Sequence, residues 1–486
     1  MPLPIAIAAP NAVSAEVARG IVADGGNALD AAIGAAVAAM ASEPGVVAPG
    51  AGAYVTLAQR GSSSVVFDGY LAVPGLGGRH PDPVCHVATM EYGGGVSTVV
   101  GPASIAVPGA WAALGAAHDR FGALAWDAVL APVVALAASG SPLGATAATY
   151  LADAFGPIFS HDAVGRRALA PDGVLAVPGA SIRVDDLPDS LGRLAVAGAD
   201  DLYRGDLGRM IGTDLWSRGS HLSLADLQAY RPITRQPLEL LASGWRLMTN
   251  PAPAVGGAAL AVMLARSGSG SVPELIDAQK FVYGWRRRGG DAAVDREMAI
   301  RDLLGDPLRS GSTAHVSAAG DGLAVAITLS AGYGSGVIPT GTGMWMNNGL
   351  GEVELVGDWS RQDAGARLNS NMAPTVGTHE NGSLLAIGSP GADRITSALT
   401  QTLLHLARGA SATDAIHAPR IHVDTGEVNR IAIEPGIDVP ETGDEQLRYS
   451  DLHMYFGGVG LAMEFADGGV EAVTDPRRNG VALVLD

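Results

Sequence analysis

The sequence contains a single cysteine, Cys85, and a single lysine, Lys280. One cysteine excludes an intramolecular disulfide and a zinc site built from cysteines. The formal net charge is −18, and the cationic residues are otherwise arginines. Because a nucleic acid or an anionic membrane is bound through clustered cations, this charge argues against both as partners.

Long hydrophobic runs and targeting signals are also missing. The first ten residues include no basic residue, and prolines interrupt their apolar stretch, which is unlike a secretory signal. The alanine-rich run over residues 31–42 is too short to cross a bilayer. We therefore expect a soluble, cytoplasmic protein without a membrane partner.

Several motifs of enzyme chemistry are absent as well. The sequence has no Gly-x-Ser-x-Gly nucleophile elbow, no Walker phosphate-binding loop and no His-Glu-x-x-His motif. His417 and His422 are spaced loosely like metal ligands, but no cysteine or acidic cluster accompanies them, so a structural role is favoured. We expect neither a metal ion nor a cofactor.

What is present is the pattern of a globular α+β protein. Hydrophobic residues make up 48% of the chain and charged residues 16%, which excludes disorder. Asn27 is expected to cap a helix over residues 28–41 that ends at Glu43-Pro44. Helical patterns dominate before about residue 309, and strands with glycine turns dominate after it. Such blocks predict layered α+β architecture.

A hairpin signal lies in the second part of the chain. Two β-branched runs, residues 316–319 and 323–329, flank Gly320-Asp321-Gly322. A turn centred on Asp321 would place Thr313 opposite Thr328 or Leu329. The preceding Arg-Ser-Gly-Ser is a segment in which strain or cleavage is tolerated.

This arrangement permits one kind of chemistry. A threonine hydroxyl is a weak nucleophile until a base removes its proton, and a free α-amino group on the same residue supplies that base. Creating the amine at Thr313 requires cleavage of the Ser312–Thr313 peptide bond. The spacing alone favours the interpretation of Thr313 and Thr328 as ordinary β-branched strand residues.

The segment resembles the processing site of the gamma-glutamyltranspeptidase family, in which Thr-Thr-His opens the small subunit. Here the corresponding residues are Thr313-Ala314-His315. Further family-like motifs follow in the same order along most of the chain: Gly25-Gly26-Asn27-Ala28, Val107-Pro108-Gly109, Ala229-Tyr230-Arg231, Met346-Asn347-Asn348, Met372-Ala373-Pro374-Thr375, Gly388-Ser389-Pro390-Gly391, Ala418-Pro419-Arg420 and Asp475-Pro476-Arg477-Arg478.

The resemblance implies an N-terminal nucleophile hydrolase folded as a four-layer αββα sandwich. The precursor would be cut into residues 1–312 and 313–486, and the two fragments would remain associated. Thr313 would attack the substrate carbonyl, and Thr328 would orient the new N-terminus. Gly391 and Ala392 match a Gly-Gly pair whose N–H groups stabilise an oxyanion. The partner would be a small molecule.

The positions that correspond to the family's substrate pocket differ from its pattern. The arginine that binds the glutamyl carboxylate is replaced by Tyr70, which removes a bidentate contact. The other substitutions place Ser330 where the family has asparagine, Glu352 where it has aspartate, and Ser370-Asn371 where it has paired serines. Several changes in one recognition shell argue against a gamma-glutamyl substrate.

Four functions remain open on this basis. The favoured one is an autoprocessing amidohydrolase or acylase for a small non-glutamyl acyl compound. Some similar enzymes cleave a C–C bond next to a carbonyl in dehydroproline antibiotic pathways. A true gamma-glutamyl hydrolase or transpeptidase is the third. A non-catalytic scaffold is the fourth, although retention of Thr313, Thr328 and Gly391 speaks against it.

Overall fold

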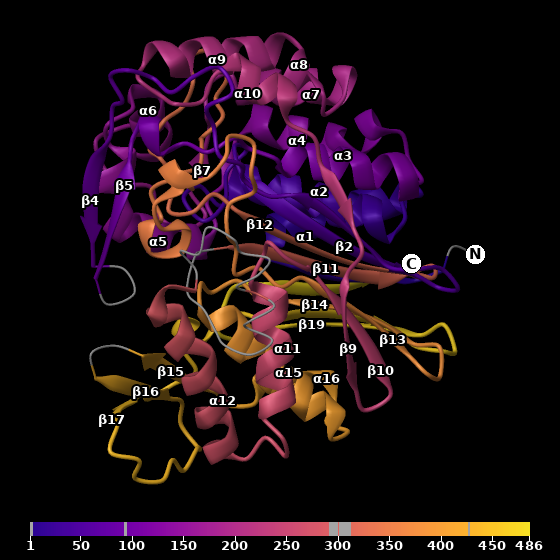
Figure 1. The fold of residues 1–486 in the computed structure, drawn as a ribbon. Helices are drawn as coiled ribbons and strands as arrows, with labels where there is room; N and C mark the ends of the chain where they lie inside the picture. Colours follow the sequence, from indigo (N-terminus) through magenta and orange to yellow (C-terminus); the bar gives the residue numbers. More distant parts are fainter. Residues whose placement is uncertain (1–2, 92–94, 291–299, 301–312, 426–427) are drawn as a thin grey trace.

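The computed structural model describes residues 3–91, 95–290, 300, 313–425 and 428–486. The predicted cleavage position Ser312 lies outside the described residues, whereas Thr313 lies within them. Two β-sheets are stacked face to face in the middle of the molecule, and helices cover both outer surfaces (Figure 1). The predicted α+β class and αββα sandwich are therefore confirmed.

The first sheet is antiparallel and has seven strands among the described residues. In spatial order these are β20 (Val481–Leu485), β1 (Ile5–Ala9), β11 (Ala314–Gly320), β12 (Leu323–Ser330), β2 (Gly52–Gln59), β3 (Val65–Gly69) and β8 (Ile233–Arg235). The two ends of the chain thus pair with each other, and β11 lies beside β1. Strands from before and after Thr313 are therefore combined in one sheet.

The second sheet has six strands in the described part of the chain. Their order is β19 (Val470–Thr474), β18 (Gly460–Glu464), β14 (Leu384–Gly388), β13 (Thr375–His379), β10 (Trp245–Thr249) and β9 (Leu238–Ala242). It packs through β14 and β18 against β11 and β12 of the first sheet. Small side chains form much of this contact, including Ala6, Ala319, Ala462, Ala324, Ala326 and Ala386. The alanine-rich composition lets the sheets approach closely.

Helices α1 (Ala12–Ala23), α2 (Ala28–Ser42), α3 (Ala110–Phe121) and α4 (Trp126–Ser139) cover the first sheet (Figure 1). The predicted helix after Asn27 is confirmed: Asn27 and Asp30 form a reciprocal capping box. Every residue of α2 is buried, and the helix contacts β11 and β12. Strand β11, which begins directly after Thr313, therefore packs against the fully buried helix α2.

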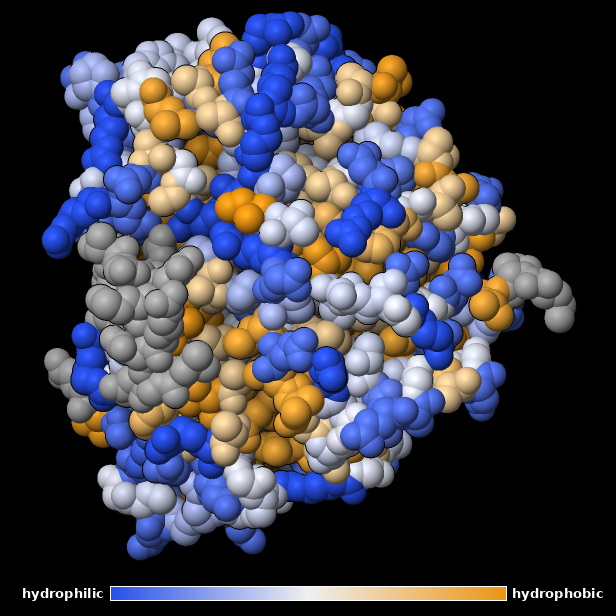
Figure 2. Space-filling view, turned by 45° about the vertical axis from the view of Figure 1, so that its right-hand side comes forward, coloured by the Kyte–Doolittle hydropathy of each residue, from blue (hydrophilic) through white to orange (hydrophobic). Residues whose placement is uncertain are grey.

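Helices α11 (Gly256–Arg266), α12 (Val272–Trp285), α15 (Arg394–Ala407) and α16 (Ala412–His417) lie on the side of the second sheet (Figure 1). Other α-helices in the described part of the chain are α5 (Ala145–Ala154), α6 (Ala163–Leu169), α7 (Leu187–Ala197), α8 (Asp201–Arg204), α9 (Asp206–Ser217), α10 (Leu224–Ala229) and α14 (Val353–Val356). The other strands among the described residues are β4 (His86–Met90), β5 (Val96–Val100), β6 (Ser141–Pro142), β7 (Ser181–Ile182), β15 (Ile421–Thr425), β16 (Asn429–Ile433) and β17 (Glu445–Arg448). On the face in Figure 2, hydrophobic residues form separate patches among hydrophilic ones.

The predicted hairpin exists, but its predicted register is wrong. Ala314 pairs with Leu329 and His315 pairs with Thr328. Continuing this register by one residue places Thr313 opposite Ser330 rather than opposite Thr328 or Leu329. The reason lies in the turn: Asp321 and Gly322 both have positive φ, 51° and 72°, so the loop has two residues and Gly320 already belongs to the strand.

Candidate active site

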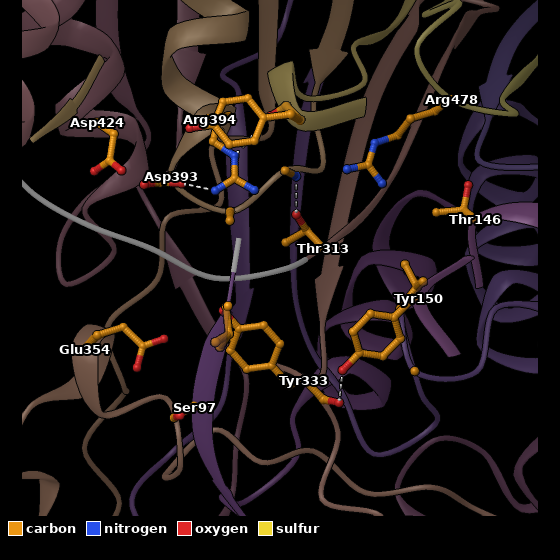
Figure 3. A pocket seen from close by; sticks show the side chains of 17 residues that line it. Ser97, Thr146, Tyr150, Thr313, Tyr333, Glu354, Asp393, Arg394, Asp424 and Arg478 are labelled. Carbon is orange, nitrogen blue, oxygen red and sulfur yellow. Dashed lines mark hydrogen bonds and ion pairs between the residues drawn. The ribbon is translucent and has the colours of Figure 1, made fainter. Parts of the chain in front are cut away.

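Thr313 lies immediately before β11 and its side chain is buried, with 4% exposure. The backbone N–H of Gly391 donates a hydrogen bond to Thr313 Oγ1 with an N···O distance of 3.3 Å. Gly391 belongs to the loop that connects β14 to α15. Figure 3 shows this bond at the wall of a cavity. The structure thus brings together two residues that the sequence predicted as parts of one site.

The loop conformation at Gly391 depends on glycine. Its φ is +132°, and a Cβ atom at this position would lie 2.9 Å from Gly457 Cα. Ala392 follows with φ of 61°, a left-handed conformation that alanine adopts at some cost. Both residues lie just before α15, where the helix dipole favours negative charge. The backbone therefore suits a developing oxyanion next to Thr313.

A chain of hydrogen bonds runs from Thr328 into the interface between the sheets. His315 Nδ1 lies 2.8 Å from Thr328 Oγ1, and His315 Nε2 lies 2.7 Å from Ser317 Oγ. Ser317 Oγ donates to the carbonyl of Gly460 at 3.1 Å. Because the Ser317 hydroxyl donates its proton to that carbonyl, the Ser317 oxygen accepts a hydrogen bond from Nε2–H of His315. His315 Nδ1 is then the unprotonated ring nitrogen and accepts a hydrogen bond from the Thr328 hydroxyl.

The ring of His315 is fully enclosed, and this burial lowers its pKa to about 3. The imidazole is therefore neutral, as the hydrogen-bond chain requires. The Thr328 hydroxyl donates its proton to His315, which leaves the lone pairs of Thr328 Oγ1 free to accept from another donor. The sequence patterns predicted a role for Thr328 but none for His315 or Ser317, because the strand register decides which side chains meet.

The residues predicted to recognise substrate form a buried cluster. Burial raises the pKa of the Tyr70 phenol, as does the nearby Glu352, whereas hydrogen bonds with Ser370 and Ser330 oppose the rise. Tyr70 also stacks on Tyr54 with ring centroids 5.5 Å apart. Burial, followed by the charge of Glu354, raises the pKa of Glu352 well above its usual range and favours a protonated carboxyl.

Asn371 belongs to the same region but has a different partner. Its Oδ1 accepts a hydrogen bond of 2.5 Å from Arg286 Nη2, and both side chains are buried. Asn371, like the other four predicted substrate-binding residues, is not among the residues that line the cavity at Thr313. The sequence prediction thus identified residues that the fold brings close to one another, and it missed the cavity wall.

The cavity beside Thr313 has a volume of about 370 Å³. Gly391 and Ala392 line it, together with side chains of mixed charge (Figure 3). The polar side chains of its wall are Ser97, Thr146, Tyr150, Thr313, Tyr333, Glu354, Asp393, Arg394, Asp424, Tyr455 and Arg478. This volume accommodates a small molecule.

The Asp475-Pro-Arg-Arg478 motif is divided between two environments. Arg477 is buried and bonded to Glu434 and Asp475, and Asp475 also pairs with Arg420 at 2.7 Å. Arg478, the next residue, lines the cavity. The signal that could have identified it is the motif itself, but nothing in the sequence shows which of its two arginines faces the interior.

A second, smaller cavity of about 40 Å³ adjoins Thr313 and is also lined by Glu43, His315 and Arg478. Glu43 accepts hydrogen bonds from Asn11 Nδ2 at 2.7 Å and from the N–H of Ala147 at 3.0 Å. Burial raises the pKa of Glu43 to about 7, although these hydrogen bonds and the charge of Arg478 oppose the rise. An acid that titrates near neutrality therefore lies close to the predicted nucleophile.

The described residues include no group of three or more His, Cys, Asp or Glu side chains arranged to hold a metal ion. Within the same part of the chain, no helix has both the length and the apolar character required to span a membrane.

Comparison with known proteins supports the architecture and defines the family. The αββα sandwich is that of the N-terminal nucleophile hydrolases. The crystal structure of cephalosporin acylase from Bacillus halodurans matches this fold with a TM-score of 0.80 and 23% identity, covering 99% of this chain and 96% of that chain.

Sequence comparison extends over the same length. A profile of the gamma-glutamyltranspeptidase family matches residues 14–308 and 291–485. The chain is 26% identical to the glutathione hydrolase proenzyme of Pseudomonas aeruginosa, covering 99% of this chain and 94% of that protein. It is 28% identical to the acylase ACY 1 proenzyme of Pseudomonas sp. strain SE83, covering 84% and 80%. This chain belongs to the gamma-glutamyltranspeptidase family and is an amidohydrolase of the N-terminal nucleophile class.

Proposed function

We propose that the chain cleaves its own Ser312–Thr313 bond and that Thr313 then serves as the nucleophile of an amidohydrolase for a small acyl compound other than gamma-glutamyl. The observation that carries this proposal is the contact of 3.3 Å between Gly391 N–H and Thr313 Oγ1 at the wall of the cavity. Relatives named as proenzymes support the cleavage step.

Cleavage follows from the chemistry of the hydroxyl. Thr313 Oγ adds to the carbonyl carbon of Ser312, the C–N bond breaks, and the nitrogen takes up a proton. The resulting ester is hydrolysed by water, which yields a carboxylate at Ser312 and frees both the hydroxyl and the α-amine of Thr313. The fragments 1–312 and 313–486 would stay together, because β1, β2 and β3 share a sheet with β11, β12 and β20.

In turnover, the α-amine of Thr313 takes the hydroxyl proton while Oγ attacks the substrate carbonyl. Negative charge on the carbonyl oxygen is stabilised by the N–H groups of Gly391 and Ala392 at the start of α15. Collapse of this intermediate expels the leaving amine, which receives the proton. Water then attacks the acyl ester and regenerates Thr313. Thr328 Oγ1, which donates to His315, accepts from the α-amine and orients it.

The choice of a non-glutamyl substrate rests on the buried cluster around Tyr70. The phenol stacks on Tyr54 and cannot provide the bidentate charge of an arginine. Burial raises the pKa of Glu352 and so favours its uncharged form, which binds a substrate ammonium poorly. Relatives from Pseudomonas sp. and Bacillus halodurans are named as acylases, and these names support an acyl group other than gamma-glutamyl.

The test combines a denaturing gel with intact mass measurement. Purified wild type should separate into fragments 1–312 and 313–486, and the Thr313→Ala variant should remain a single chain without activity. Brief incubation with a panel of acyl anilides should add one acyl mass to the second fragment. A full-length wild type that still turns over substrate would disprove the mechanism. A gamma-glutamyl adduct would instead identify a true gamma-glutamyl hydrolase.

A further inference from the structure

His315 lies between the two sheets, close to the predicted nucleophile. It follows Thr313 by two residues, and side chains two apart along a strand lie on the same face of the sheet. Both face the second sheet, because Thr313 Oγ1 contacts the loop after β14 and the His315 ring contacts β14 itself. Elsewhere this interface contains many alanines, and His315 is 4% exposed. A buried polar ring in such surroundings is stable only when its nitrogen atoms have hydrogen-bond partners.

On its own sheet the ring has a partner at each nitrogen. His315 Nδ1 accepts a hydrogen bond from the Thr328 hydroxyl over 2.8 Å, and Nε2–H donates to Ser317 Oγ over 2.7 Å. The Ser317 hydroxyl donates in turn to the carbonyl of Gly460, in the second sheet, at 3.1 Å. The Ser317 contact therefore keeps the ring proton on Nε2 and leaves Nδ1 as the acceptor for Thr328.

The edge of the ring between its two nitrogens lies against the end of β14. A Cβ atom on Gly388 would lie 2.7 Å from His315 Nε2 and closer still to Nδ1 and Cε1, so only glycine leaves room for the ring. Gly388 pairs with Gly460, where a Cβ would lie 3.5 Å from His315 Cδ2. The loop that includes Gly391 starts directly after Gly388. The ring thus rests on the strand end from which the predicted oxyanion loop departs.

The two groups that assist Thr313 in the proposed mechanism belong to different sheets. Thr328 is part of β12 in the first sheet, whereas the Gly391 N–H follows β14 of the second. His315 contacts Thr328 through a hydrogen bond and the end of β14 through its ring. A displacement of about 1 Å at an active site lowers a rate by up to roughly 100-fold. A rigid ring between the two sheets therefore controls how well these groups are aligned.

We propose that His315 is a positioning residue that aligns these two groups around Thr313. Through Nδ1 it directs the lone pairs of Thr328 Oγ1 toward the α-nitrogen of Thr313, and through its ring it sets the position of the oxyanion loop. The α-nitrogen is the leaving group of self-cleavage and the base of turnover, so both steps depend on this alignment. The inference rests on the proposed function, which makes Thr313 the nucleophile.

Substitution of His315 separates the hydrogen bond from the filling of space. Asn presents Oδ1 near the position of Nδ1 and accepts a hydrogen bond, whereas Leu is closer to histidine in volume and accepts none. His315→Leu should lower the rates of self-cleavage and of turnover roughly 2- to 10-fold. Thr328→Ala should slow the wild type and His315→Asn but add little to His315→Leu, because the acceptor is already lost there. His161→Asn, at an exposed position, is the matched control.

Substitution of Gly388 tests the contact with the second sheet. The Cβ of Gly388→Ala collides with the ring, so the strand end must move, and both rates should fall by up to roughly 100-fold. Asn is smaller than His and gives this methyl group room, so the double variant His315→Asn, Gly388→Ala should be faster than Gly388→Ala alone. Gly192→Ala is the matched control, because a Cβ at this position of α7 has open space around it.

Two measurements follow the variants. Denaturing gels taken at intervals measure self-cleavage, and hydrolysis of the acetyl, glutaryl and phenylacetyl 4-nitroanilides measures turnover. Because His315 does not line the cavity of about 370 Å³, kcat should fall while KM changes little. Circular dichroism verifies that each variant is folded, and if His315→Leu is not, the comparison of Gly388→Ala with the double variant decides.

Three results would overturn the inference and leave the proposed function intact. They are wild-type rates in His315→Leu, a Thr328→Ala effect of the same size with His, Asn and Leu at residue 315, and a double variant that is no faster than Gly388→Ala. A wild type that stays full length would instead refute the proposed function and this inference with it.

Discussion

The Thr328 hydroxyl donates a hydrogen bond to His315 Nδ1 across the β11–β12 pair, with the two heavy atoms 2.8 Å apart. This bond determines which way the threonine proton points. Because the proton is directed at His315, the lone pairs of Thr328 Oγ1 remain available to the α-amine that cleavage would create at Thr313. Buried His315 thus sets the orientation of a residue predicted to position the catalytic base.

Thr328→Ala should therefore slow both self-cleavage and turnover. Loss of the hydrogen bond to the amine lowers the rate roughly 2- to 10-fold, and more if the buried His315 Nδ1 is left without a donor. Time-resolved gels measure cleavage and steady-state assays measure turnover. Thr328→Ser keeps the hydroxyl and should retain most of the activity. Normal cleavage and a normal rate in Thr328→Ala would exclude Thr328 from the site.

Gly391 and Ala392 should respond in opposite ways to exchange of their side chains. Gly391→Ala introduces a Cβ that meets Gly457 Cα at 2.9 Å, so the loop must shift and its N–H must move away from Thr313. We expect kcat to fall roughly 100- to 1000-fold, as for the loss of one oxyanion donor.

Ala392→Gly is the matched control for this loop. It removes the cost of a left-handed alanine but adds backbone entropy to the unfolded chain, so stability should change by no more than about 1 kcal/mol. Activity should be retained. Kinetics and thermal unfolding of the two variants give the comparison, and an active Gly391→Ala enzyme would refute the assignment of this N–H.

Glu43 should make the stability depend on pH. Burial raises the pKa of Glu43 in the folded protein to about 7 from its usual 4.5. Between these two pKa values, Glu43 is ionised in the unfolded chain but still protonated in the folded protein. The free energy of unfolding therefore falls as the pH rises, by up to about 1.4 kcal/mol per pH unit. Glu43→Gln cannot ionise and should gain stability relative to wild-type Glu43 over this interval.

Urea unfolding at several pH values from 4.5 to 7.5 tests this expectation. Both the reference protein and the Glu43→Gln variant carry Thr313→Ala, so that neither chain is cleaved. The contributions of other titrating groups cancel in the difference between the two free energies of unfolding. Glu16→Gln, which removes an exposed carboxylate of α1, is the control for a Glu-to-Gln exchange at the surface. A stability difference between the reference protein and the Glu43→Gln variant that does not vary with pH would disprove the raised pKa.

A gamma-glutamyl anilide should be a very poor substrate even for the fully cleaved enzyme. A site built for a hydrogen-bonded charged group discriminates by roughly 10⁴–10⁵ against a mismatch. Tyr70→Arg alone should not restore activity, because residue 70 is buried against Tyr54. In addition, Glu352 and Ser330 differ from the family pattern. The test is steady-state kinetics: a kcat/KM of about 10⁴ M⁻¹s⁻¹ or above for the gamma-glutamyl anilide would contradict the changed specificity.

Local features of the chain were determined by the sequence itself. Asn27 with Asp30 specifies the start of α2 through a capping box that involves only neighbouring residues. The glycine-rich turn at Asp321 specifies a hairpin, and the order of family motifs specifies the sandwich. The positions of Thr313, Thr328 and Gly391 could be named in advance because they belong to those motifs.

Only the tertiary structure decided which of these residues meet. The hairpin register depended on two consecutive positive φ angles, at Asp321 and Gly322, and a shift of one residue changes every cross-strand pair. The partnership of His315 with Thr328 follows from that register. Likewise, Arg477 and Arg478 are adjacent in sequence, yet packing buries one among carboxylates and directs the other into the cavity. Side-chain environments arise from contacts between residues far apart in the sequence, and local sequence patterns do not predict such contacts.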